Sequence, residues 1–79
     1  MLRGKSTLSP RQLALIGMAA SMALAAMGLT SVQIATHLLI SARTVDQYIG
    51  EACFRLGVRN RTQAVAKAIS LGLIDAATP

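Results

Sequence analysis

The apolar residues of this chain recur at helical spacing, and no segment alternates between apolar and polar positions as a half-buried strand would. Four helices are predicted, at about residues 10–27, 31–38 and 42–55 and from the turn at 60–62 to 71. The third shows the pattern most clearly, because Val45, Ile49 and Leu56 share one face and polar residues occupy the other. We therefore expect an all-α domain.

Residues with capping chemistry precede each predicted helix, and glycine follows three of them. Two capping boxes, in which Gln follows a hydroxyl residue at the third position, start the first two helices: Ser9 with Gln12, and Thr30 with Gln33. Ser41 is the expected N-cap of the third helix, and Asn60 or Thr62 that of the fourth. Glycines that can adopt the left-handed conformation end the first, third and fourth helices: Gly28, Gly57 and Gly72.

One long stretch lacks charge. Residues 12–42 carry none if His37 is neutral, and residues 13–29 are almost wholly apolar. As a helix this segment is near the lower limit of about 17 residues for a membrane span. A basic start, an apolar middle and an A-x-A site at 23–25 also fit a signal peptide. The capping box at its start, with the alanines and glycines that dilute it, favours a core helix of a folded domain.

Composition adds that the chain is basic and hydrophobic at once. Its 79 residues allow one domain, and eight Lys and Arg against three Asp and Glu give a net charge of +5. A hydrophobic content of 53% argues against disorder. A core of this size is marginal alone, so a partner subunit or a neighbouring domain is expected.

Catalytic chemistry has little support in the sequence. His37 and Cys53 lie on separate predicted helices, and they are too few for a structural zinc site within one chain. We interpret Cys53 as a small core residue and His37 as a surface residue. Tyr48 and Phe54 are too few for a base-stacking platform, and no glycine-rich phosphate loop is present. We expect no enzyme, no metal and no cofactor.

Basic residues cluster around the third helix. Four fall at its start, at its end and in the turn that follows: Arg43, Arg55, Arg59 and Arg61. A short helix, a tight turn and a longer helix precede that turn, which is the organisation of a helix-turn-helix DNA-binding unit. A plain helical bundle with a solvated basic face shows the same pattern, so the residues alone leave both open.

Several blocks of the sequence stand in an order and at a spacing that resemble one known family. They are LSPRQ at 8–12, GLTSVQIA at 28–35, SARTV at 41–45, LGVRNRTQAV at 56–65 and LGLI at 71–74. These blocks resemble the LuxR-type (GerE-type) helix-turn-helix domain. The resemblance implies a four-helix LuxR-type helix-turn-helix domain with an extended first helix. It further implies the cytoplasmic, DNA-binding effector domain of a bacterial transcriptional regulator.

The chain departs from the family pattern in four places. About six extra residues, placed within 21–27, precede Gly28 and could lengthen the first helix or add a contact surface. Asp46 stands where the family often has a Lys that contacts DNA, Tyr48 where it has His, and Gly50 where a basic residue is frequent. Asp46 repels phosphate but can accept a hydrogen bond from a cytosine amino group.

The resemblance also implies site residues and partners. Thr30 or Ser31 and Thr44 would hold phosphates of double-stranded DNA through hydroxyls and helix N-terminal amides. Arg43, Asp46 and Gln47 would face the base edges. Arg59 and Arg61 would add charged contacts to phosphates. Val65 and Ile69 are candidates for a homodimer contact on the fourth helix, with core packing as the alternative.

Regulators of this family carry an N-terminal sensor or receiver domain, and 79 residues leave no room for one beside the helix-turn-helix domain. We therefore expect a fragment or a stand-alone domain, divided into a basic arm at 1–8, the folded domain at 9–74 and a tail at 75–79. A helical interaction module with weak DNA binding is the second hypothesis, and a small membrane protein the third.

Overall fold

The computed structural model describes residues 7–75, which form four α-helices and, within that range, no strand. The helices are α1 Pro10–Ala26, α2 Ser31–Leu38, α3 Ala42–Leu56 and α4 Arg61–Ser70. The all-α prediction is confirmed. The predicted arm at 1–8 and tail at 75–79 fall almost wholly outside the described residues.

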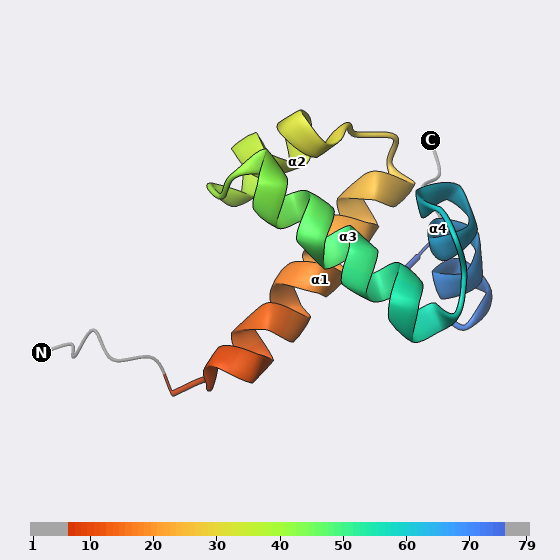
Figure 1. Ribbon diagram of the computed structural model, residues 1–79, viewed down its shortest axis with the longest axis horizontal. Coiled ribbons are helices and arrows are strands. Elements are labelled where there is room, and N and C mark those ends of the chain that lie inside the picture. The colour runs from red at the N-terminus through yellow and green to blue at the C-terminus, as the bar shows by residue number, and fades with distance from the viewer. Residues whose placement is uncertain (1–6, 76–79) are drawn as a thin grey trace, which may run out of the picture.

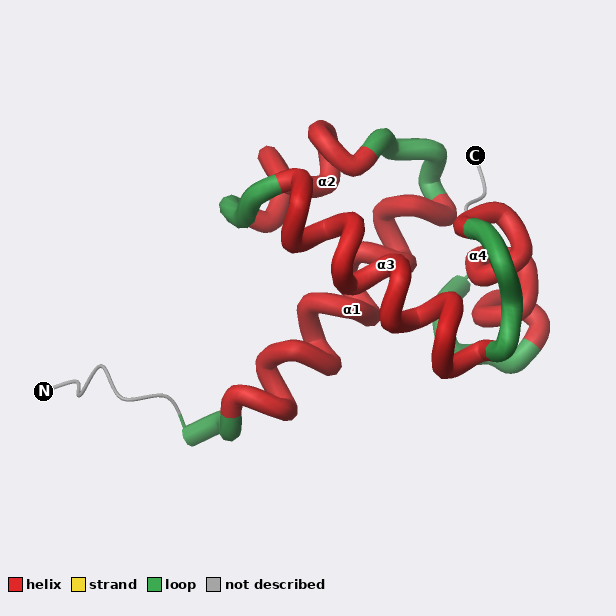
Figure 2. Tube along the Cα trace, in the orientation of Figure 1, coloured by secondary structure: helices red, strands yellow, loops and turns green. Residues whose placement is uncertain are grey.

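α3 occupies the centre of the domain and contacts each of the other three helices (Figure 1). α1 crosses behind it and also contacts α2 and α4. α2 and α4 lie on different sides of α3 and make no close backbone contact with each other. Short loops join consecutive helices (Figure 2), which keeps α2 and α4 beside α3, whereas α1 reaches α3 by packing across the domain.

Local capping sets the helix starts as the sequence predicts. Ser9 Oγ accepts from the Gln12 amide at 3.2 Å, and Gln12 Oε1 accepts from the Ser9 amide at 2.8 Å. Thr30 and Gln33 form the second box, with the corresponding distances of 3.2 and 2.9 Å. Of the two candidate caps for α4, Asn60 is the N-cap, and its Oδ1 accepts from the Gln63 amide at 2.9 Å.

The turn between α2 and α3 contains the one non-glycine residue with positive φ among residues 7–75. Leu39 ends α2 in the left-handed conformation, with φ 59°, and its side chain is 90% exposed. The Ile40 amide then donates to the Ala35 carbonyl at 3.1 Å, which closes the helix end. Leu39 thus adopts the left-handed conformation although its Cβ atom makes this conformation unfavourable.

The core is small and rich in alanine. All four helices contribute buried side chains: Met22, Ile34, Ala35, Val45, Ile49, Ala52, Ala64 and Ala68. Half of these residues are alanine, so the helices approach closely and bury little surface per residue. Cys53 is half-buried beside this core, in line with its interpretation as a small packing residue, and His37 is exposed.

α1 divides into two halves with different surroundings. Residues 10–16 are exposed and project from the body of the domain, whereas Ser21 and Met22 are buried (Figure 1). The segment 21–27, where the sequence suggests an insertion, is thus continuous helix up to its C-cap at Met27, and it joins the core. Within the described residues, no helix is long and apolar enough to cross a membrane.

Gly17 lies at the junction of the two halves. A Cβ atom built on it would lie 2.6 Å from Cε2 of Tyr48, so the tyrosine ring rests directly on the α1 backbone. The glycine therefore permits a close approach between α1 and α3 within an unbroken helix.

Candidate nucleic-acid interface

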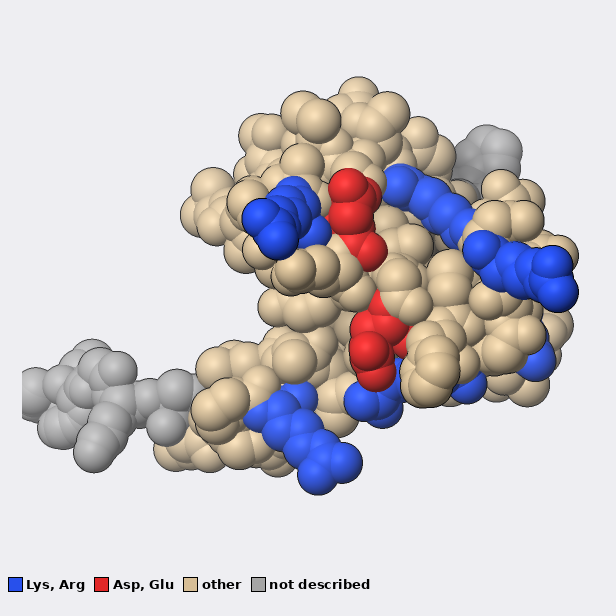
Figure 3. All heavy atoms as spheres, in the orientation of Figure 1, with Lys and Arg blue, Asp and Glu red and all other residues tan. Residues whose placement is uncertain are grey.

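α3 presents one buried and one exposed face. Its buried residues are Val45, Ile49 and Ala52. The opposite face carries the exposed polar positions that the sequence predicts: Arg43, Asp46, Gln47, Gly50 and Glu51. In Figure 3 acidic atoms run along the middle of the visible face, with basic atoms on either side of them. α3 is thus held by three neighbours while it offers a charged surface to solvent.

The first turn of α3 is fixed by its own hydroxyl groups. Ser41 Oγ accepts from the Thr44 amide at 3.0 Å and lies 2.9 Å from Thr44 Oγ1. Thr44 is half-buried, and its hydroxyl is engaged with Ser41. Thr30, at the start of α2, is exposed and uses its side chain in the capping box with Gln33.

A chain of hydrogen bonds joins α4, α2 and α3. Arg61 Nη1 donates to Ser31 Oγ at 3.0 Å, and Ser31 Oγ donates to Asp46 Oδ1 at 2.5 Å. Arg61 Nη2 donates to the Leu29 carbonyl, in the loop before α2. This half-buried guanidinium therefore spans the gap between two helices whose backbones do not approach each other.

The predicted site residues consequently separate into two groups. Arg61 and Ser31, assigned to phosphates from the sequence, make contacts inside the domain. The side chains of Arg43, Gln47 and Arg59 are exposed and make no hydrogen bond or ion pair to any residue in the range 7–75. The side-chain links of Arg61 span 30 and 32 positions, and no local sequence signal marks them.

Two further basic side chains, Arg55 and Lys67, have partners within the domain. Arg55 Nε pairs with Glu51 Oε2 at 2.8 Å, one helical turn apart on α3 and about half exposed. Lys67 Nζ donates to the Leu56 carbonyl at 2.7 Å and thereby ties α4 to the last turn of α3. Neither contact was predicted from the sequence.

Comparison with known proteins now decides the family. The family described as "Bacterial regulatory proteins, luxR family" matches residues 6–68, most of the chain. The chain belongs to the LuxR family. It is a helix-turn-helix DNA-binding domain of a transcriptional regulator, and the family is not one of enzymes.

Curated members of the LuxR family include close relatives. The chain is 50% identical over 50 residues to the "HTH-type quorum sensing-dependent transcriptional regulator RpaR" of Rhodopseudomonas palustris, a match that covers 63% of this chain and 21% of the relative. It is 41% identical over 70 residues to the "HTH-type quorum sensing-dependent transcriptional regulator VjbR" of Brucella ovis, covering 89% of this chain and 25% of the relative.

A third relative is much shorter than these two. The "Spore germination protein GerE" of Bacillus subtilis is 39% identical over 46 residues, which cover 58% of this chain and 62% of the relative. The chain thus spans a fifth to a quarter of the length of RpaR and VjbR. No solved structure matches it with comparable significance.

α4 of this LuxR-type domain carries the candidate dimer residues. Val65 and Ile69 are both half-buried, and Val65 packs against the core while Ile69 is not among the residues that do so. Beyond α4, Leu71 and Leu73 are more than half exposed. Ile69 is therefore the candidate with more side chain available to a partner.

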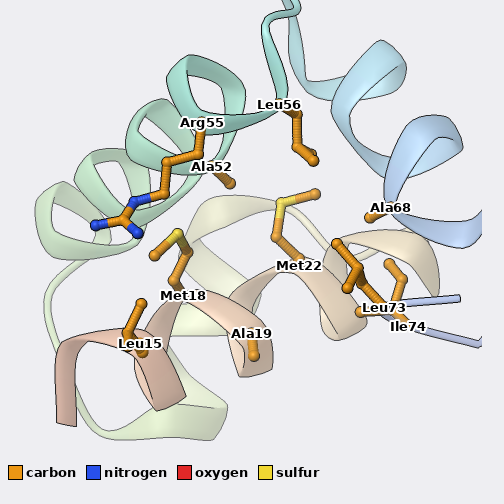
Figure 4. Close-up of a pocket in the computed structure, with 10 residues that line it drawn as sticks. All are labelled: Leu15, Met18, Ala19, Met22, Ala52, Arg55, Leu56, Ala68, Leu73 and Ile74. Carbon is orange, nitrogen blue, oxygen red and sulfur yellow. The ribbon is translucent and has the colours of Figure 1, made fainter. Parts of the chain in front are cut away.

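An apolar groove lies on the domain where α1, α3 and the chain after α4 meet (Figure 4). It has a volume of about 270 Å³. Leu15, Met18 and Met22 line it from α1, and Leu73 from the C-terminal segment. This groove is chemically unlike the exposed polar face of α3.

Proposed function

We propose that this chain binds duplex DNA as a dimer and that α3 of each copy enters the major groove. The exposed face of α3, with Arg43 and Gln47 unpaired, is the observation that carries the proposal. Base recognition requires side chains with unused donors or acceptors on a helix whose position is fixed. Contacts with α1, α2 and α4 supply that fixed position. Such a regulator would work in the cytoplasm, where bacterial DNA lies.

The proposed contacts follow the chemistry of each side chain. The Arg43 guanidinium suits the two acceptors of guanine, and the Gln47 amide suits adenine. Arg59 is the main charged phosphate contact, because its guanidinium has no partner inside the described domain. Thr30 and Thr44 stand at helix N-termini, where backbone amides also favour phosphate. Arg61 and Ser31 support the surface from within.

Fluorescence anisotropy on duplexes at several salt concentrations tests this assignment. Arg59→Ala should weaken binding to all duplexes alike and lower the salt slope by about one unit. Gln47→Ala should relax the preference at one base pair and leave the salt slope unchanged. Arg11→Ala is the matched control, since it removes an exposed charge from the projecting half of α1. If the unaltered chain binds no duplex at low salt, the proposal fails.

The dimer contact is proposed to lie on α4, at Val65 and Ile69. Helix-turn-helix dimers read two half-sites about one helical turn apart, so a pair of half-sites should bind far more tightly than a single one. Ile69→Glu should abolish this difference, measured by anisotropy together with sedimentation velocity. Ala66→Glu adds the same charge at an exposed position of the same helix. Loss of dimers with Ala66→Glu but not with Ile69→Glu would contradict the assignment.

The length of RpaR and VjbR supports a second part of the proposal, that this domain acts under the control of a neighbouring sensor domain. The names of both relatives include quorum-sensing dependence. Comparing DNA affinity of the 79-residue chain with that of a longer gene product, if one is encoded, would test whether another domain alters binding.

A second candidate function, an interaction module with weak DNA binding, is favoured by the projecting half of α1. Leu13 and Ile16 are 46% and 53% exposed there, on a segment without charge after Arg11. Sedimentation at several concentrations with and without duplex separates the two functions. Tight oligomers that are indifferent to DNA would favour the interaction module.

A further inference from the structure

Asp46 is an acidic residue on the exposed face of α3. Asp46 is exposed, and its Oδ1 accepts from Ser31 Oγ at 2.5 Å. Its other oxygen, Oδ2, has no hydrogen-bond partner among residues 7–75, and the carboxylate forms no ion pair there. One oxygen is therefore bound within the domain while the other is available to a ligand.

The donor to Oδ1 is itself fixed. Ser31 is half-buried in the first turn of α2, and its hydroxyl oxygen accepts from Arg61 Nη1 at 3.0 Å. Since the lone pair faces Arg61, the hydroxyl proton is directed to Asp46. Arg61 is held in turn by the Leu29 carbonyl. The carboxylate orientation is thus determined by contacts with α2 and α4 and not by α3 alone.

A carboxylate fixed in this way can only accept hydrogen bonds. In the major groove the donors are the amino groups of cytosine N4 and adenine N6, whereas guanine and thymine present acceptors. Adenine also presents its N7 acceptor beside the amino group, which repels a second carboxylate oxygen. Cytosine has no such neighbour and is the base that carboxylates commonly read.

We propose that Asp46 is a specificity-determining residue that reads the cytosine of a C·G pair through Oδ2, with Ser31 and Arg61 as its positioning residues. This rests on the proposed function, because α3 must lie in the major groove for Oδ2 to reach a base. The Arg61 guanidinium, two hydrogen bonds away, partly offsets the repulsion between Asp46 and the DNA backbone.

The experiment measures the affinity of the chain for duplexes, selected from a random pool, in which each base pair is then varied in turn. The unaltered chain should prefer C·G by about tenfold at one position. Asp46→Ala should flatten that position and leave the others as they are. Asp46→Asn keeps an oxygen for Ser31 but turns the other end into a donor, so the preference should change to a base with an acceptor, guanine or thymine.

Variants of Ser31 test its positioning role. Thr30, not Ser31, is the N-cap of α2, so Ser31→Ala leaves the capping box intact. It should reduce the preference at the Asp46 position and no other, and Ser31→Thr, which retains a hydroxyl, should restore it. Circular dichroism and thermal unfolding of each variant establish that the fold is kept.

The outcomes separate this inference from the proposed function. If the chain binds DNA and Asp46→Ala keeps the same preference at every position, the inference is wrong while the proposed function stands. If Asp46→Ala tightens binding to every duplex equally, Asp46 is only a repulsive charge, and the inference is again wrong. If the unaltered chain binds no duplex, both fail.

Discussion

Two residues of this domain have backbone surroundings that decide which side chain is tolerated. Gly17 has no room for a Cβ atom because the Tyr48 ring lies against it, and Leu39 holds a conformation that glycine adopts more easily. At Gly17 the side chain is excluded by a neighbour, while at Leu39 it is exposed and only the backbone is strained. Glycine is therefore favoured at both positions, at Gly17 by the neighbouring ring and at Leu39 by the backbone conformation.

Leu39→Gly should stabilise the domain. Relief of about 1–2 kcal/mol of left-handed strain exceeds the added entropy of glycine in the unfolded chain, about 0.5–1 kcal/mol. Little burial is lost, because the leucine is 90% exposed. Urea unfolding should give a gain of about 0.5–1 kcal/mol. Leu39→Ala keeps a Cβ atom and should give no such gain; an equal gain from both variants would show that strain is not the cause.

Gly17→Ala should destabilise the domain, although alanine favours helix by about 1 kcal/mol over glycine. The new methyl group would meet the tyrosine ring at 2.6 Å, and overpacking of this kind costs about 1–3 kcal/mol. In a Tyr48→Ala background the same change should become neutral or stabilising. A double-mutant cycle by urea unfolding measures the coupling, and additivity of the two changes would contradict the contact.

At the scale of the helices, sequence and structure agree where the determining contacts are local. The capping boxes at Ser9 and Thr30 act within three positions, so their chemistry is readable directly from the sequence. The left-handed end of α2 at Leu39 was not predicted, since its usual glycine is absent. The polar face of α3 was predicted from periodicity, yet its internal bracing by Arg61 was not, because those partners lie 30 and 32 positions away.

Arg61 connects α4 to the start of α2, and its loss should lower stability. Arg61→Ala removes charged donors from Ser31 and from the Leu29 carbonyl in half-buried surroundings, at a cost of about 1–3 kcal/mol. Arg59→Ala is the matched control, because its exposed guanidinium has no partner in the described domain and its loss should cost about 0.5 kcal/mol or less. Urea unfolding compares them, and equal losses would refute the bracing role.

At the scale of the whole molecule, the hydrophobic character of the chain is divided between two places. Met22 in the second half of α1 belongs to a core of mostly small residues, while Leu13 and Ile16 in the first half lie outside it. Of the exposed arginines without side-chain partners among residues 7–75, Arg43 and Arg59 lie at the start of α3 and in the turn after it, and Arg11 lies on the projecting half of α1. The domain thus combines the exposed polar surface of α3 with an apolar extension of α1. It is elongated, with extents of 43 × 25 × 23 Å.

Hydrogen exchange should report this division of α1. Amides near Leu13 to Gly17 open by local fraying and should exchange quickly, whereas those near Ser21 to Ala26 should exchange only with larger unfolding, because their side chains join the core. Exchange measured by NMR on dilute protein makes the comparison. Equal protection of both halves at every protein concentration would contradict it; protection of the first half that rises with concentration would indicate pairing between copies.

The contact between Gly17 and Tyr48 couples the projecting half of α1 to α3. The Tyr48 ring of α3, the helix proposed to enter the DNA groove, lies against the α1 backbone at Gly17, where the projecting and packed halves of α1 join. Only the Tyr48 ring lies between the α1 backbone and α3 at this point, so a displacement of the outer turns of α1 would reach α3 through this side chain. A partner bound to the projecting half of α1 would therefore act, through Gly17 and Tyr48, on the helix proposed to enter the major groove.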